Sequence, residues 1–310
     1  MAVTEIRKTQ PFSERVRETL RQMRNNWSAY LFIAPGLIHF AIFTLFAVGF
    51  AFYISFHEWN IIKPDKPFVG LENYRELFDD PRFIRAVTNT FTFMIGVPLN
   101  LTVGLLVALL LNTKVRGQAI YRTLFYIPTV TPLVVSSIIW KWVYQGDYGL
   151  LNYYLLKLGL IDHKIVWLAD PDLALPALII MMIWGGTGAT MVIYLAGLQS
   201  IPEEMYDAAK VDGASSLQRL FYITIPLLRP TTFFLTITGI IGTFQIFTEV
   251  YIMTNGGPLN RTTTIGYYLY TNAFRELKMG YATSMAFVLF AMIFVFTLIQ
   301  WKFTRGDVEY

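Results

Sequence analysis

Residues that could carry out catalysis are few and scattered in this sequence. The chain has no cysteine, and its three histidines, His39, His57 and His163, lack the spacing of a metal site. One acid, Glu249, stands near the end of a long apolar stretch, where an ionisable side chain is costly and marks a functional candidate. It has no evident second acid, histidine or nucleophile beside it to form a catalytic pair. The sequence therefore predicts neither a metal site nor an enzyme, and a solvated, interfacial Glu249 is an equally good interpretation.

Two clusters of hydroxyls, amides, aromatic rings and small residues offer binding chemistry instead. These are the groups that bind a polyhydroxylated ligand such as a sugar. The candidate substrate-pathway residues are Trp184, Gly186, Thr187, Thr190, Thr243, Phe244, Gln245, Thr248, Glu249 and Tyr251. Glycine and threonine are also common at plain contacts between membrane helices, and this second interpretation stays open for each of them.

Long apolar segments must position these residues. Of the 310 residues, 55% are hydrophobic and 15% are charged, whereas soluble domains carry about 25% charged residues. Stretches without Asp, Glu, Lys or Arg run over residues 28–56, 86–113, 123–140, 173–202, 230–248 and 279–301. Each approaches or exceeds the roughly 18–20 residues that cross a bilayer, and a segment in lipid must be helical. The predicted fold class is all-α, a polytopic membrane protein with six transmembrane helices.

The boundaries follow from these stretches. The spans are expected at about residues 29–56, 86–112, 121–143, 173–199, 231–253 and 280–302. They form a transmembrane domain of residues 29–303, between an N-terminal tail of residues 1–28 and a C-terminal tail of residues 304–310. Basic residues outnumber acidic ones in the two tails and the loops on their side, so both termini are predicted to be cytoplasmic. The same bias explains the net charge of +4 without a nucleic-acid partner.

The segment of residues 200–230, between the fourth and fifth spans, is predicted to be a cytoplasmic helix–turn–helix. Pro202 and the two acids after it suit the first turn of a helix. Gly213 ends that helix, because glycine adopts the left-handed conformation without a Cβ penalty. Ser215 and Gln218, three residues apart, can form the capping box of a second helix.

The first of these helices presents Met205, Ala208 and Ala209 on one face. Small side chains at such a face suit docking in the groove of another protein. The alternative is an ordinary connecting loop that packs on the bundle, and the residues alone do not separate the two.

The segment resembles the EAA loop of ABC importer permeases, whose pattern is Glu-Ala-Ala, three residues, Gly, nine residues and Ile-x-Leu-Pro. This chain has Asp207-Ala-Ala209, then Gly213, then Ile223-Thr-Ile-Pro226. Asp207 replaces Glu and keeps its charge on a shorter side chain, and Ile225 replaces Leu with a similar volume. Other stretches resemble the carbohydrate branch of that family, which contains the larger permease of the maltose transporter. They are Phe68-Val-Gly-Leu-Glu-Asn-Tyr74, Gly149-Leu-Leu-Asn152, Thr254-Asn-Gly-Gly-Pro258, Thr262-Thr-Thr264 and Gly280-Tyr-Ala-Thr-Ser284.

The resemblance implies a permease subunit of a binding-protein-dependent ABC importer in a prokaryotic cytoplasmic membrane. Such a subunit forms half of a translocation pathway and couples to a separate ATPase through the EAA loop. The coupling residues implied are Glu204, Met205, Asp207, Ala208, Ala209, Asp212, Gly213, Ala214 and Pro226. The implied partners are a second, different permease, an ABC ATPase dimer, an extracytoplasmic solute-binding protein, the lipid bilayer and a sugar.

No cofactor is expected in this chain itself. It lacks the Gly-x-x-x-x-Gly-Lys-Ser/Thr loop that binds nucleotide, so ATP and magnesium are expected on the partner ATPase. Lys and Arg are absent from the middle of every span, which favours a neutral sugar or oligosaccharide over an anionic one. The alternatives are an ABC permease for a non-sugar solute and a stand-alone secondary transporter. The latter usually shows inverted repeats and more buried carboxylates.

Overall fold

The computed structural model describes residues 21, 25–113 and 116–304. The predicted tails, residues 1–28 and 304–310, therefore lie mostly outside the described residues. The described chain is helical, with two isolated β-bridges and no strand within it. It divides into two units, residues 1–54 and 55–310.

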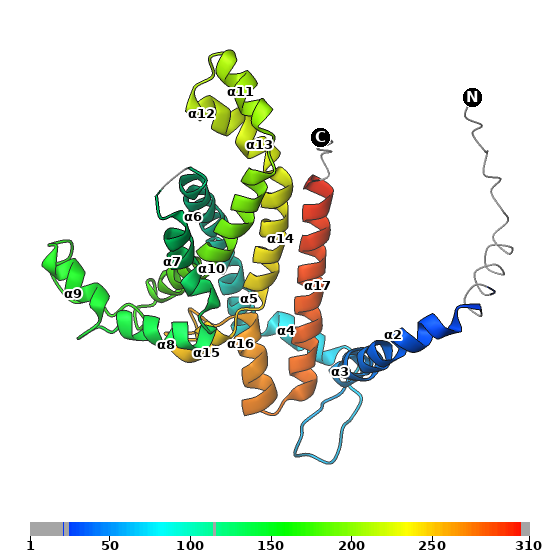
Figure 1. Cartoon of the computed structure of the whole chain (residues 1–310). Coiled ribbons are helices and arrows are strands. Elements are labelled where there is room, and N and C mark those ends of the chain that lie inside the picture. Colours follow the sequence, from blue (N-terminus) through cyan, green and yellow to red (C-terminus); the bar gives the residue numbers. More distant parts are fainter. Residues whose placement is uncertain (1–20, 22–24, 114–115, 305–310) are drawn as a thin grey trace. The chain divides into compact units, whose positions relative to one another are not determined.

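The first unit is a run of consecutive helical segments. Helix α2 covers Trp27–Phe40, a π-helical segment covers Ala41–Phe46, and α3 covers Ala47–Ser55 (Figure 1). Large apolar side chains such as Phe32 are exposed along it. A helix that is apolar on all sides is typical of a membrane span.

The second unit consists of helices of very different lengths. They are α4 (Glu72–Asp79), α5 (Pro81–Phe93), α6 (Gly96–Leu111), α7 (Gln118–Val130), α8 (Leu133–Val143), α9 (Leu150–Lys157), α10 (Ala174–Gln199), α11 (Glu203–Val211), α12 (Ser216–Arg219), α13 (Ile225–Leu227), α14 (Arg229–Phe244), α15 (Thr248–Met253), α16 (Ile265–Tyr270) and α17 (Met279–Thr304). Two further segments, Leu220–Thr224 and Thr271–Arg275, are π-helical.

Within the described residues, four stretches are long and apolar enough to cross a membrane. They are Tyr30–Ser55, Pro81–Leu111, Ala174–Gln199 and Met279–Lys302. Two bent pairs qualify if each counts as one span, namely Gln118–Val130 with Leu133–Val143 and Ser216–Leu227 with Arg229–Phe244. The structure thus agrees with the predicted helical, polytopic membrane protein, with four to six candidate spans.

The helix expected over residues 121–143 is divided by a sharp bend. Helix α7 ends at Val130 and α8 begins at Leu133, with 97° between them. Thr131 between them is extended, with ψ of 128°, because the residue before a proline is kept out of the α region. The chain therefore changes direction at Pro132, and residues 121–143 do not form one continuous helix.

The helix expected over residues 231–253 is also interrupted. Helix α14 ends at Phe244, and α15 begins only at Thr248. The break leaves the carbonyl of Ile246 free, and Thr264 Oγ1 donates a hydrogen bond to it at 2.7 Å. A side chain from elsewhere in the fold stabilises this break, which is why the local sequence does not predict it.

A shared carboxylate joins α5, α16 and α17. The helix of the second span begins at Pro81, earlier than residue 86, and the Asp80 side chain caps it by accepting from the Arg82 backbone N–H. Asp80 Oδ2 also accepts from the Tyr268 and Tyr281 hydroxyls, each at 2.7 Å. Burial raises the pKa of Asp80, but these hydrogen bonds outweigh it and hold the pKa below its ordinary value.

Helix α10 lies at the centre of the packing, and small residues let its neighbours approach closely. A Cβ added at Gly104 of α6 would lie 2.4 Å from Thr190 Cγ2 on α10, and one added at Gly188 would lie 2.4 Å from the Phe125 carbonyl of α7. Such contacts are typical of helices packed in membranes. These glycines therefore set the distances between α10, α6 and α7.

Candidate functional site

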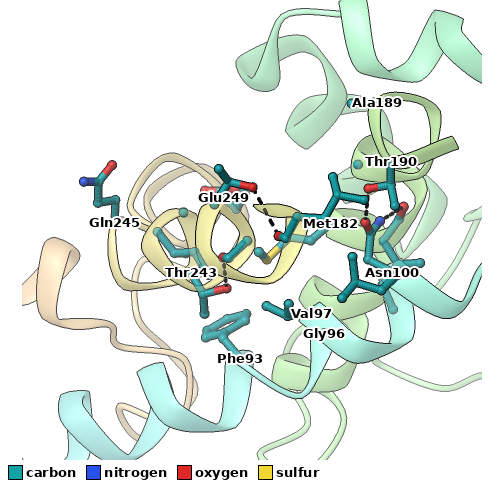
Figure 2. A pocket seen from close by; sticks show the side chains of 18 of the residues that line it. Phe93, Gly96, Val97, Asn100, Met182, Ala189, Thr190, Thr243, Gln245 and Glu249 are labelled. Carbon is teal, nitrogen blue, oxygen red and sulfur yellow. Dashed lines mark hydrogen bonds between the residues drawn. The ribbon is translucent and has the colours of Figure 1, made fainter. Parts of the chain in front are cut away.

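A cavity of about 560 Å³ lies within the second unit, between α5–α6, α10 and the α14–α15 segment. Figure 2 shows Asn100 and Thr190 on one side of it, with Thr243 and Glu249 on the other. The volume falls in the range of small-molecule sites, about 300–1,000 Å³. Its walls are mainly apolar, with a few polar groups, which is the composition of a ligand pocket.

The break between α14 and α15 builds one wall of the cavity. Every residue from Gln245 to Glu249 lines it, together with Thr243 on the last turn of α14. An unwound backbone at membrane depth is tolerated where it is buried in protein or lines a cavity. Thr264 Oγ1 donates a hydrogen bond to the Ile246 carbonyl, which would otherwise lack a helical partner. A specific side-chain contact therefore stabilises the break in the cavity wall.

The opposite wall carries a polar pair between α6 and α10. Asn100 Nδ2 donates to the Ile183 carbonyl at 3.0 Å, and Thr190 Oγ1 donates to Asn100 Oδ1 at 2.6 Å. Gly186 makes room for this amide, because a Cβ there would lie 2.9 Å from Asn100 Nδ2. The pair fixes the orientation of the amide at the cavity surface.

Glu249 is the single ionisable residue among those that line the cavity. Its side chain is buried, and the other polar lining residues are Asn100, Gln245 and threonines. No Lys or Arg lines the cavity, and its polar groups are one carboxyl, two amides and several threonine hydroxyls. These groups can donate and accept hydrogen bonds to a polar ligand.

Six of the ten predicted pathway residues line this cavity. They are Gly186, Thr190, Thr243, Gln245, Thr248 and Glu249. In Figure 2 the Gln245 side chain points away from Asn100 and Thr190. Residues from two separate stretches of the sequence therefore meet at one place.

The other four predicted residues lie elsewhere. Trp184 and Thr187 are on a different face of α10 from Gly186, and line an apolar pocket of about 600 Å³ beside α7 and α8. Phe244 is fully buried against other aromatic rings, including Phe91 at 5.7 Å between centroids. Tyr251 stacks on Phe247 beside the cavity. Residues that are adjacent in a helical sequence point to different faces of the helix, whereas only the residues on one face line a given cavity.

Sequence reasoning missed the contribution of α5 and α6. Phe93, Gly96, Val97 and Asn100 line the cavity. The signal for Asn100 was present, since an amide inside an apolar stretch needs a partner. Nothing local indicated that it faces α10.

The predicted helix–turn–helix is present at α11 and α12, and its turn follows the expected chemistry. Gly213 has φ of +77°. Its N–H donates to the Lys210 carbonyl at 3.1 Å, and the Ala214 N–H donates to the Ala209 carbonyl at 2.9 Å. These two bonds are the Schellman ending of a helix. The predicted capping box is also there, with the Ser215 and Gln218 side chains each bonded to the other's backbone N–H.

Large apolar side chains are exposed on the helix pair and on the π-helical segment after it, among charged and polar ones. Met205, Leu217 and Tyr222 are 46%, 67% and 80% exposed. Of the predicted coupling residues, those exposed are Glu204, Met205, Asp207, Ala208, Asp212 and Gly213, and those half-buried are Ala209, Ala214 and Pro226. One side-chain contact, between Tyr206 Oη and Thr224 Oγ1 at 3.0 Å, joins α11 to the segment that leads to α14.

Comparisons with known proteins agree with these features. A family model described as "Binding-protein-dependent transport system inner membrane component" matches residues 100–305, more than half of the chain. The lactose transport system permease protein LacF of Rhizobium radiobacter is 37% identical over 288 residues, which are 91% of this chain and 94% of LacF. The trehalose/maltose transport system permease protein MalF of Thermococcus litoralis is 34% identical over 278 residues, 89% of this chain and 93% of MalF.

Solved structures share the fold, among them the crystal structure of a bacterial ABC transporter involved in the import of the acidic polysaccharide alginate. A chain of that transporter matches with a TM-score of 0.81 and 23% identity, over 94% of this chain and 100% of that chain.

Proposed function

We propose a function from one premise: this chain belongs to the family of binding-protein-dependent transport system inner membrane components, the permeases of ABC importers. Membership confirms the predicted resemblance, and its relatives LacF and MalF are named as permeases of sugar transport systems. On this premise the chain forms half of the translocation pathway for a neutral sugar or oligosaccharide, and it couples to a separate ATPase through α11 and α12.

The exposed apolar surface of α11 and α12 carries the coupling role. Its apolar side chains include Met205 and Leu217, which are exposed within the described chain. Both helices are capped, so docking orders little additional chain. Exposed apolar side chains on a rigid, capped pair favour a docking element over a connecting loop.

The chain connects this element directly to both walls of the cavity. Helix α10 ends at Gln199, just before α11, and α14 begins at Arg229, just after α13. A displacement of the helix pair therefore pulls on the helices that carry Thr190 and Thr243. ATP binding by the partner ATPase moves the pair and changes the access to the cavity between α10 and α14.

The orientation follows from the same element. Helices α11 and α12 lie at the same end of the second unit as the C-terminal end of α17 (Figure 1). If this end meets the ATPase, it is cytoplasmic, and the C-terminus is cytoplasmic too. The loop and both termini are assigned to the cytoplasmic side.

The neutral substrate is supported by the cavity lining. Glu249 is its single ionisable residue, and no basic side chain lines it. An acidic sugar would bring its charge into a buried cavity that holds no basic counter-ion. A neutral sugar instead offers hydroxyls to Glu249 and to the Asn100–Thr190 pair.

The partners proposed are a second permease, different from this chain, an ABC ATPase dimer and an extracytoplasmic solute-binding protein. ATP and magnesium bind to the ATPase. The assembly lies in a prokaryotic cytoplasmic membrane, and nucleic acid is not a ligand.

The test is uptake by the whole importer in proteoliposomes, with radiolabelled lactose and maltose as probes. We expect uptake that requires ATP on the ATPase side and the binding protein on the other side. Uptake driven by a proton or sodium gradient without ATP would identify a secondary transporter. ATP-dependent uptake of a non-sugar solute with neither sugar bound would overturn the substrate assignment alone.

A further inference from the structure

A row of aromatic side chains continues from the cavity along α15 and α16. We call Phe247, Tyr251, Tyr270 and Phe274 the aromatic strip. Phe247 lines the cavity, and its ring centroid lies 5.4 Å from that of Tyr251 and 4.9 Å from that of Tyr270. Tyr270 is in turn 5.4 Å from Tyr251 and 5.3 Å from Phe274. The strip therefore runs through ring contacts from Phe247 at the cavity wall to the exposed Phe274.

The strip begins at the break in the fifth helix. Phe247 directly precedes α15 and Tyr251 lies on it, while Tyr270 ends α16 and Phe274 lies in the π-helical segment that follows. The Tyr270 ring contacts the other three rings of the strip, which brings the two pairs together. The break at Ile246, whose carbonyl accepts from Thr264 Oγ1, comes directly before Phe247.

Two rings of the strip are exposed, whereas Phe247 packs against the buried core. Tyr251 is 36% exposed and Phe274 is 62% exposed, and the Arg275 guanidinium lies 5.8 Å from the centre of the Tyr251 ring. Exposed aromatic surface that borders a ligand cavity is typical of a binding site. Arg275 at the outer end also supplies hydrogen-bond donors for ligand hydroxyls.

We propose that the aromatic strip binds sugar rings beyond the one in the cavity, so that the substrate is an oligosaccharide of two or more rings. The electron-rich face of an aromatic ring attracts the polarised C–H groups on the face of a pyranose. Side-chain hydroxyls of Tyr251 and Tyr270 and the guanidinium of Arg275 bind its edge. This inference rests on the proposed sugar-import function and extends it from substrate class to substrate length.

The experiment measures uptake by the whole importer, reconstituted with its own partners, of radiolabelled malto-, cello- and galacto-oligosaccharides of one to four rings. In the wild type we expect uptake of members with at least two rings. Tyr251→Ala and Tyr270→Ala should lower kcat/KM for these members about tenfold, equal to about 1.4 kcal/mol of binding per site. Tyr251→Phe should lose less than Tyr251→Ala, because it keeps the stacking face and loses only the hydroxyl.

Tyr153 is a matched control. Its ring lies 5.2 Å from that of Tyr154 and has Lys157 at 5.8 Å, but it is on α9, away from the cavity lining. Tyr153→Ala should leave uptake at all lengths unchanged. If Tyr251→Ala lowered kcat/KM equally for one-ring and longer sugars, or did not lower it at all, the proposed role of the aromatic strip would be wrong. The proposed sugar-import function would still stand. Uptake of single rings alone by the wild type would lead to the same conclusion. Failure of the wild type to take up any member would contradict the proposed function itself.

Discussion

The helix–turn–helix of α11 and α12 and the cavity differ in how the sequence encodes them. The first is local, since every cap and turn residue lies within residues 203–218, and Gly213, Ser215 and Gln218 bond to close neighbours. The cavity is assembled from α5, α6, α10, α14 and α15, and its polar contacts cross up to 90 residues, as between Thr190 and Asn100. A local element can keep its shape while it docks on a partner. An assembled cavity changes shape when its helices move.

The largest expected effect comes from the turn of the local element. Gly213→Val places a β-branched residue at φ of +77°, at a cost of roughly 1–2 kcal/mol. No atom lies within 4 Å of the new Cβ, so the change redirects the turn without a clash. We expect sugar uptake per ATP hydrolysed to fall about 10- to 100-fold, the usual range of coupling between sites.

Gly159→Val is the control for this prediction. Gly159 has φ of +66° and no atom within 4 Å of an added Cβ, but it follows α9. Its coupling ratio should stay at the wild-type value. A normal ratio in Gly213→Val, with the complex assembled, would show that α11 and α12 are a passive connection.

Local chemistry also explains what could be predicted from the sequence. The Schellman ending and the capping box depend on residues three to five apart, so the pattern predicts both. The spans follow from charge-free length, and the helical fold agrees with them. The break at Ile246 depends on Thr264, and the orientation of Asn100 depends on α10. Both are tertiary contacts between segments far apart in the sequence, and this is why the contribution of α5 and α6 to the cavity was missed.

A charge reversal in the cavity is the next largest effect. Glu249→Lys removes the lone acid of the lining and adds a cation, so the preference for a neutral sugar over its uronic acid analogue should fall about tenfold, or about 1.4 kcal/mol. Competition between the two labelled sugars in proteoliposomes measures this ratio. Glu249→Gln should give an intermediate ratio. An unchanged ratio in Glu249→Lys would remove Glu249 from the substrate pathway.

An effect on stability rather than on transport is expected where the cavity helices touch. Gly104→Ala puts a Cβ 2.4 Å from Thr190 Cγ2, so α6 and α10 must separate, at about 1–3 kcal/mol of stability. Gly185→Ala on α10 meets no atom within 4 Å and should be neutral or stabilising. Thermal unfolding in detergent compares the two. Equal melting temperatures would mean that the cavity helices are not closely packed.

The smallest effect is the loss of one cap. Ser215→Ala removes half of the capping box, which should destabilise α12 by about 1 kcal/mol and leave the cavity unaffected. Hydrogen exchange at the Gln218 amide should accelerate about fivefold, the factor for 1 kcal/mol. Ser216→Ala keeps the box and is the control. Faster exchange that spreads to α10 and α14 would show that the pair is not an independent local element.

The central claim is that α11 and α12 transmit the ATPase cycle to the cavity, and one crosslink tests it most directly. The chain has no native cysteine, so Ala208→Cys gives a single reactive site on the exposed face of α11. In membranes that hold the whole importer, the account predicts a short-crosslinker product with the ATPase subunit whose yield changes when ATP is added. Gly159→Cys should give none. An assembled complex in which Ala208→Cys forms no product with the ATPase, with or without ATP, would contradict the account.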